Sequence, residues 1–162
     1  MIKIIYIEAI EEYENVGKNR DFSIFLAGGI TNCPNWQKDL VKSLENTDLV
    51  IYNPRRKNFP INDPDASFEQ IKWEHKYFRK ADMISFWFSR GSLNPIVLFE
   101  LGRWSHFILQ KVIFVGVDPE YKRKQDVEIQ LSLEKPEIEI VYSLSSLSKQ
   151  IKEFWKFITK KR

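Results

Sequence analysis

Short apolar runs that alternate with stretches of helical spacing restrict the fold of this chain more than any other feature. Strands separated by single helices pair in parallel through right-handed crossovers, and near-continuous apolar strands are typical of a sheet covered on both faces. We therefore predict an α/β fold with one doubly wound sheet of about five mainly parallel strands. The sequence does not decide whether the first run joins this sheet. The apolar runs are residues 2–7, 23–27, 49–52, 83–88, 111–117 and 138–141.

Helices are expected between and after these strands. Pro34 suits the first turn of a helix, because its missing N–H would have no partner there. Ser67 and Gln70 form a capping-box pattern at the start of another helix, and Asn94 before Pro95 is a typical helix cap. The predicted helices occupy about residues 34–44, 67–80, 94–109, 118–133 and 145–159.

The ligand crevice of such a sheet lies beyond the carboxyl ends of its strands. The segments expected to converge there are 28–35, 53–65, 89–94 and 118–124. A chain of 162 residues is most simply one domain. We predict a single domain over 1–162, with its core at about 22–142 and a C-terminal helix at about 145–159.

Composition narrows the partners and the compartment. The net charge of +3 is too small to indicate a nucleic-acid partner, and no recognised nucleic-acid module is visible. No segment approaches the ~20 apolar residues of a membrane span. Cys33 is the single cysteine, which excludes an internal disulfide and a cysteine-based zinc site. We expect a cytoplasmic protein with a small-molecule partner, no membrane contact and no nucleic-acid partner.

Common cofactor motifs are missing. Gly28-Gly29 does not continue into the Gly-x-Gly-x-x-Gly fingerprint of dinucleotide-binding proteins, and no phosphate-binding P-loop occurs. His75 and His106 are the only histidines, and neither has metal-ligand spacing with a second histidine or cysteine. We expect neither a metal nor an organic cofactor, and structural roles for both histidines.

Carboxylates remain as candidates for chemistry. Glu100 lies in an apolar segment, where an unpaired charge would lose its water at a cost of several kcal/mol, roughly. Glu74 lies on the inner side of the preceding helix, whereas Asp82 precedes a strand and belongs at the opposite edge of the sheet. Only Glu74 and Glu100 can meet, as the two carboxyl groups that flank a glycosidic bond do. The alternatives are ordinary ion pairs, of Glu100 with Arg103 and of Glu74 with a neighbouring lysine or arginine.

Eight segments in one order resemble the nucleoside 2-deoxyribosyltransferase superfamily, especially its transferase-like branch. The resemblance covers about residues 22–126, and it is more specific for the family than for the exact reaction. The segments are Ile24-Phe25-Leu26-Ala27-Gly28-Gly29-Ile30, Trp36-Gln37, Tyr52-Asn53-Pro54-Arg55-Arg56, Gln70-Ile71-Lys72-Trp73-Glu74-His75, Ala81-Asp82, Phe86-Trp87-Phe88, Pro95-Ile96 and Glu100-Leu101-Gly102-Arg103.

The resemblance implies a flavodoxin-like sheet and cleavage of an N-glycosidic bond with retention. Glu100 would attack the anomeric carbon of a 2-deoxyribosyl group, and Glu74 would give a proton to the leaving base. A second base, or water, would then attack the glycosyl-enzyme. The residues expected to contact the substrate are Phe25, Gly28, Gly29, Asn53, Arg55, Arg56 and Asn94.

Two positions depart from the family pattern. The family's transferases carry an aspartate six residues before the nucleophile, where this chain has Asn94. The amide of Asn94 cannot transfer a proton as an aspartate could. Asn94 could instead serve as a helix cap. Phe25 replaces a tyrosine that contacts the nucleophile, and Tyr52 is the candidate replacement partner for Glu100. Both changes bear on base exchange more than on the fold.

Other functions stay open at this point. A hydrolase of 2-deoxynucleoside 5′-monophosphates could hold phosphate through Arg55 or Arg56, and those arginines could equally pair within the surface loop. A nucleotide-binding or sensing module without turnover is a further alternative. The family also implies a homo-oligomer, a dimer or larger, in which a neighbouring chain completes each site. Residues 121–126 are the candidate donor segment.

Overall fold

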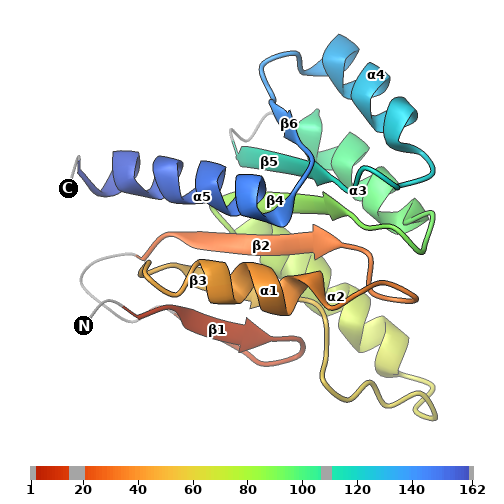
Figure 1. The fold of residues 1–162 in the computed structure, drawn as a ribbon. Coiled ribbons are helices and arrows are strands. Elements are labelled where there is room, and N and C mark those ends of the chain that lie inside the picture. The colour runs from red at the N-terminus through yellow and green to blue at the C-terminus, as the bar shows by residue number, and fades with distance from the viewer. Residues whose placement is uncertain (1–2, 15–20, 107–110, 161–162) are drawn as a thin grey trace.

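The computed structural model describes residues 3–14, 21–106 and 111–160. Within them, six parallel strands form one sheet in the order β1-β3-β2-β4-β5-β6, together with five helices (Figure 1). The strands are β1 (Ile5–Glu8), β2 (Ser23–Gly28), β3 (Val50–Asn53), β4 (Met83–Phe88), β5 (Val112–Val117) and β6 (Ile140–Val141). The helices are α1 (Trp36–Ser43), α2 (Ala66–Lys80), α3 (Pro95–Ser105), α4 (Lys124–Glu134) and α5 (Leu144–Thr159). The predicted α/β doubly wound fold is confirmed.

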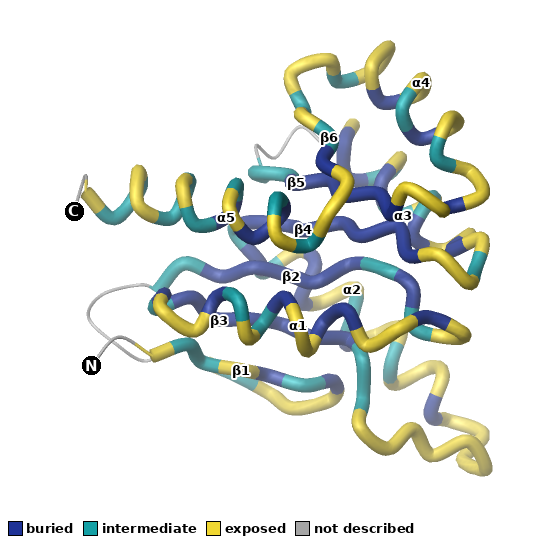
Figure 2. Tube along the Cα trace, in the orientation of Figure 1, coloured by how far each residue is buried: buried dark blue, intermediate teal, exposed yellow. Residues whose placement is uncertain are grey.

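Helices cover both faces of the sheet. Helices α1 and α5 pack on one face, and α2, α3 and α4 pack on the other (Figure 1). Side chains of β2 alternate between the two cores, because successive residues of a strand point to opposite faces. Ile24 and Leu26 belong to the core under α1, whereas Phe25 and Ala27 belong to the core under α2. Strands β3 and β4 are buried throughout (Figure 2), as their continuous apolar sequences predict.

The first apolar run does join the sheet, so the predicted number of strands was one too low. Strand β1 pairs in parallel with β3, from Ile5 opposite Val50 to Glu8 opposite Asn53. The paired strand therefore lies later than the predicted run, whose first residue is outside the described residues. The bounds of β1 are therefore set by its hydrogen bonds to β3 and not by the apolar composition of the segment.

Helix starts differ from prediction where a side chain has another partner. Helix α2 begins at Ala66, one residue before the predicted start, and Asp65 precedes it without a side-chain cap bond. Ser67 lies inside the helix and Gln70 donates to other oxygens, so the predicted capping box is wrong. Helix α4 begins at Lys124, later than predicted. The segment before it contains a turn, in which Asp118 Oδ1 accepts a hydrogen bond from the backbone N–H of Glu120 at 3.0 Å. The predicted helix start at Asp118 is therefore wrong, because its side chain closes an Asx turn instead.

Helix α1 begins at Trp36, two residues after Pro34, and its cap is Asn35, whose side chain accepts from the Lys38 backbone N–H. Helix α3 begins at Pro95, as predicted, and ends at Ser105. The rest of the predicted helix falls largely on residues 107–109, outside the described residues.

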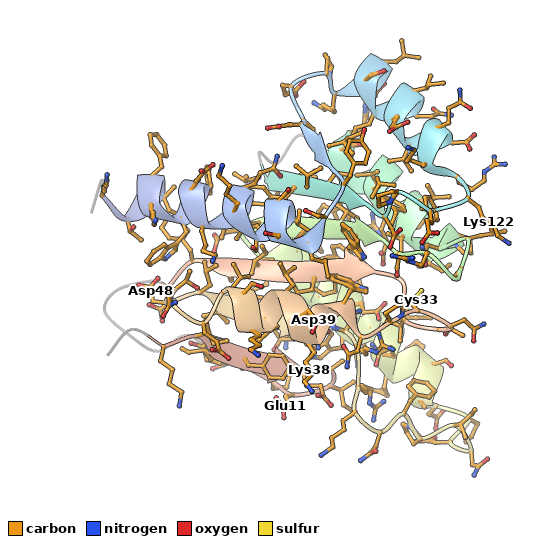
Figure 3. The ribbon with its side chains drawn as sticks, in the orientation of Figure 1. Glu11, Cys33, Lys38, Asp39, Asp48 and Lys122 are labelled. Carbon is orange, nitrogen blue, oxygen red and sulfur yellow. The ribbon has the colours of Figure 1, made fainter. Side chains whose placement is uncertain are left out.

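The strand order fixes where a ligand can bind. From β2 the chain continues through α1 to β3 on one side, and from β4 it continues through α3 to β5 on the other. The carboxyl ends of β2 and β4 are neighbours, so the loops that follow them diverge and leave a crevice between them. Figure 3 shows Cys33 in the loop after β2 at this edge, and Asp48 at the opposite edge of the sheet.

No helix of the described residues is long and apolar enough to cross a membrane. The cytoplasmic location expected from the sequence stays a prediction.

Candidate active site

A cavity of about 760 Å³ lies at the switch point between β2 and β4. Its walls come from the end of β2 and the loop after it, from α2, and from the start of α3. Glu74 and Glu100 both line it, so the two glutamates that the sequence singled out share one cavity. Glu74 is in the third turn of α2, and Glu100 is in the second turn of α3. Their backbones are held by two different helices that pack on the same face of the sheet.

Asp82 lies at the other edge of the sheet, as predicted. Its carboxylate accepts hydrogen bonds from Ser23 at the start of β2, from the backbone N–H at 2.9 Å and from the hydroxyl at 2.8 Å. This aspartate joins the amino ends of two strands and is remote from the cavity.

Glu74 is held by one neighbouring amide. Gln70 Nε2 donates to Glu74 Oε1 at 2.8 Å and to the backbone oxygen of Pro54 at 2.7 Å. Burial raises the pKa of Glu74, and the Gln70 hydrogen bond lowers it in part. In the described residues no salt bridge joins Glu74 to a lysine or arginine, so the ion-pair alternative for this residue is wrong there.

Glu100 is partly buried, and no described residue donates a hydrogen bond to its carboxyl group. Burial raises the pKa of Glu100 to about 8, the negative charge of Glu74 contributes to the increase, and Arg103 lowers it. Arg103 forms no ion pair with Glu100 within the described part of the chain. Its guanidinium lies 5.5 Å from the ring centre of Trp104, and its Nη2 is 3.5 Å from His75 Nε2.

Burial disfavours the charged form of both carboxyl groups, and the negative charge of Glu74 further disfavours ionisation of Glu100. Carboxyl groups that interact in this way lose their protons in two steps that belong to the pair. A singly protonated pair provides one proton donor and one nucleophile in the same cavity.

Close backbone approach shapes the wall formed by Gly28 and Gly29. A Cβ atom on Gly29 would lie 2.1 Å from Asn94 Oδ1 and 2.5 Å from Cys33 Sγ. A Cβ atom on Gly28 would lie 2.3 Å from the Trp36 ring. Both positions therefore require glycine, and both line the cavity, while their contact with a substrate stays a prediction.

Asn94 occupies the position before α3 but does not cap the helix with its side chain. Its backbone is left-handed, with φ 49° and ψ 50°, and no side-chain cap bond forms. Its Nδ2 donates to the backbone oxygen of Ser89 at 3.0 Å, while its Oδ1 faces the Cys33 thiol at 3.7 Å. The side chain is buried and lines the cavity, so the predicted capping role is wrong.

Aromatic rings form the inner wall. Phe25 stacks on Phe78 with ring centres 3.9 Å apart, and Phe78 stacks on Trp104 at 5.7 Å. Tyr52, the candidate replacement for the missing tyrosine hydroxyl, packs against Tyr77 instead. It is not among the residues that line the cavity in the described structure, so nothing found there supports it as a partner of Glu100.

Three predicted substrate contacts are not among the described residues that line the cavity. Asn53 donates to the Tyr6 hydroxyl and accepts from the Arg55 backbone N–H. The guanidinium of Arg55 donates to the backbone oxygens of Pro34 and Cys33 and to the Gln37 side chain. The guanidinium of Arg56 lies 5.4 Å from the ring centre of Phe59, a residue that does line the cavity. The roles of Asn53, Arg55 and Arg56 in substrate binding stay predictions.

Sequence reasoning missed several lining residues. Gln70 was assigned to a helix cap, although its spacing of four residues from Glu74 places both on one helix face. His75 was expected to be structural, and it lines the cavity beside Arg103. Other lining residues that were not predicted are Phe59, Ser67, Ile71, Phe78, Ser92 and Phe99. Ile71 lies in the segment 70–75 that carries the family resemblance, whereas no short motif marks Phe59, Phe78, Ser92 or Phe99.

No group of three or more His, Cys, Asp or Glu residues that could hold a metal is present in the described ranges.

Comparison with known proteins identifies one family. The family model described as "Nucleoside 2-deoxyribosyltransferase like" matches residues 21–121. The matched segment contains β2 through β5, and with them both glutamates and the loops around the cavity. No curated protein matches the chain.

Proposed function

This chain belongs to the nucleoside 2-deoxyribosyltransferase-like family, and we propose that it cleaves the N-glycosidic bond of 2-deoxyribonucleosides and transfers the sugar to another base. The observation that supports this proposal is the placement of Glu74 and Glu100 in one cavity at the switch point of the sheet. Two carboxyl groups with a shared proton are what retaining cleavage of a glycosidic bond requires.

The proposed mechanism uses the singly protonated pair. The ionised carboxylate of Glu100 attacks the anomeric carbon, and the bond between that carbon and the base nitrogen breaks with its electron pair going to the nitrogen. Glu74 gives its proton to the leaving base. The acceptor base then attacks the glycosyl-enzyme with its own ring nitrogen, the ester bond to Glu100 breaks, and Glu74 takes up the proton that the acceptor loses.

The aromatic wall is suited to a nucleobase and its sugar. Phe25, Phe78 and Trp104 line the cavity with apolar side chains, and the amide of Asn94 is also part of the lining. Asn94 cannot transfer a proton, so in this proposal it acts only through hydrogen bonds. Phe25 provides no hydroxyl group to Glu100, which leaves the nucleophile without the partner expected in the family.

A neutral nucleoside fits the cavity better than a 5′-monophosphate. Among the lining residues that the structure describes, Arg103 is the only lysine or arginine. The donors of Arg55 are directed to oxygens of its own chain, and a phosphate dianion beside two carboxyl groups would need cationic partners.

The activity is tested by incubating the protein with a 2-deoxyribonucleoside and a foreign base, and in parallel with a 2-deoxynucleoside 5′-monophosphate alone. We expect a base-exchanged nucleoside in the first reaction. Free base without exchange would indicate hydrolysis, and binding without either product would indicate a sensor. Glu100→Gln should abolish turnover, while Glu45→Gln, at an exposed glutamate after α1, should retain it. Exchange by Glu100→Gln at the wild-type rate would exclude Glu100 as the nucleophile.

We also propose a homo-oligomer in which a second copy covers the mouth of the cavity. Ile71, Ile96 and Phe99 line the cavity and are 64%, 64% and 66% exposed, and apolar rims of this kind mark interaction surfaces. In the candidate donor segment, residues 121–126, Tyr121 is buried and donates to the Leu93 backbone oxygen. Tyr121 is therefore unsuited to reach the cavity of a neighbouring chain. Lys122 points outward beside it (Figure 3). Light scattering after size exclusion should give at least twice the monomer mass, and Phe99→Ser should reduce it.

A further inference from the structure

The amide of Gln70 connects one of the two carboxyl groups to the loop after β3. Its Nε2 donates to Glu74 Oε1 at 2.8 Å and to the Pro54 backbone oxygen at 2.7 Å. Both partners are acceptors, so a rotated amide would place its oxygen against two other oxygens. The geometry therefore fixes the amide with its NH₂ group toward Glu74. Gln70 Oε1 is buried and has no donor in the described structure.

Few charged groups surround this contact. The titratable or charged side chains that line the cavity are Glu74 and His75 from α2 and Glu100 and Arg103 from α3. The lining residues at the end of β2 and in the loop after it, at 27–31, add none. His75 and Arg103 contact each other, and among the described residues Gln70 is the one that donates a hydrogen bond to the Glu74 carboxyl group. Gln70 is therefore the neighbour that can act selectively on one member of the pair.

We propose that Gln70 is a positioning residue that fixes the Glu74 carboxyl group and decides which member of the pair carries the shared proton. This inference rests on the proposed function, since only a reacting pair gives the proton's location a consequence. Gln70 touches neither sugar nor base in this role, and it acts through Glu74.

The direction of the effect follows from the chemistry of the bond. An amide N–H donated to a carboxylate stabilises its ionised form. Gln70 therefore favours a charged Glu74 and leaves the proton on Glu100 in the empty cavity, in agreement with the raised pKa of Glu100 and with the lowering effect of the Gln70 bond on the pKa of Glu74. The proposed reaction needs the opposite distribution, with the proton on Glu74. Gln70 thus holds the empty site in its unreactive form, and loss of the Gln70 bond on substrate binding would release the nucleophile.

The test replaces the amide with a side chain of similar length and no donor. In Gln70→Met, the proton distribution should move about tenfold from Glu100 toward Glu74, the effect of about one hydrogen bond to a charged group. Carbon-13 shifts of the two labelled carboxyl groups, followed from pH 4 to 10, measure this without any substrate. Gln70→Leu should give the same direction, and thermal unfolding of both variants confirms that they are folded. Gln150→Met, on α5 at the other side of the sheet, is the matched control and should leave both titrations unchanged.

A second background separates an effect through Glu74 from a general disturbance. In Glu74→Gln, adding Gln70→Met should leave the Glu100 titration unchanged within about 0.2 pH units, because the pair is gone. The proposal is wrong if Gln70→Met leaves the Glu100 titration as in the wild type. It is also wrong if the same shift persists in the Glu74→Gln background. If the wild type shows the pair and these shifts but no base exchange, the proposed function fails while the positioning of the proton stands.

Discussion

Replacing Glu100 with glutamine is expected to remove a carboxyl group whose ionisation opposes folding. The pKa of Glu100 is raised from 4.5 to about 8, and each pKa unit corresponds to about 1.4 kcal/mol. A shift of this size would cost up to ~5 kcal/mol when the group is fully ionised. The side chain is partly exposed and water screens its charge, so we expect about 2–3 kcal/mol.

The pH dependence has a definite sign. The folded state holds this proton more tightly than the unfolded state, so the wild-type free energy of unfolding should fall as pH rises from about 4.5 to about 8. Glu100→Gln cannot ionise at this position. Its stability should match the wild type near pH 4.5 and exceed it by about 2–3 kcal/mol at pH 9.

Urea unfolding at intervals from pH 4.5 to 9 measures this difference. The exposed-site variant Glu45→Gln is the control and should differ from the wild type by less than about 0.5 kcal/mol throughout. A Glu100→Gln profile parallel to the wild type over the whole range would refute the reasoning, because it would mean that Glu100 titrates in the folded protein as it does in the unfolded chain.

Four further predictions concern the site and the helices and loops around it. The kcat/KM for base exchange should fall above about pH 8, as the carboxyl pair loses its last proton; a rate that still increases there would exclude a proton donor in the pair. Gly29→Ala should lower the free energy of unfolding by about 1–3 kcal/mol in urea titrations, because its Cβ would lie 2.1 Å from Asn94 Oδ1. Gly102→Ala, in α3 with nothing within 4 Å of the new atom, should instead stabilise by up to about 1 kcal/mol. Arg55→Ala should lower the melting temperature without a selective loss of affinity for a 5′-monophosphate; such a selective loss, measured by calorimetry, would restore Arg55 as a phosphate contact.

The local sequence pattern was sufficient to predict those strands and helices whose apolar spacing is clear within the segment itself. The continuous apolar run of β4 and the helical spacing of α5 were predicted with nearly correct ends. The start of α2 was predicted to within one residue, although the capping box expected there does not form. The start of α4 was predicted too early, because Asp118 forms a turn with Glu120 and an ion pair with Arg90 instead of capping a helix.

The amino-acid sequence by itself determined the α/β class and the parallel pairing of the strands. It also singled out Glu74 and Glu100, the two glutamates that line the cavity. The spacing of apolar residues is a local property of the chain, and Glu100 stands out in an apolar segment without any knowledge of its neighbours in space. The tertiary structure alone decided that β1 joins the sheet and brings the number of described strands to six. It also decided that Arg55 supports the loop around Cys33 and that Gln70 holds Glu74. These outcomes depend on contacts between residues remote in the chain or on the direction of one side chain, and neither is encoded in the spacing of residue types.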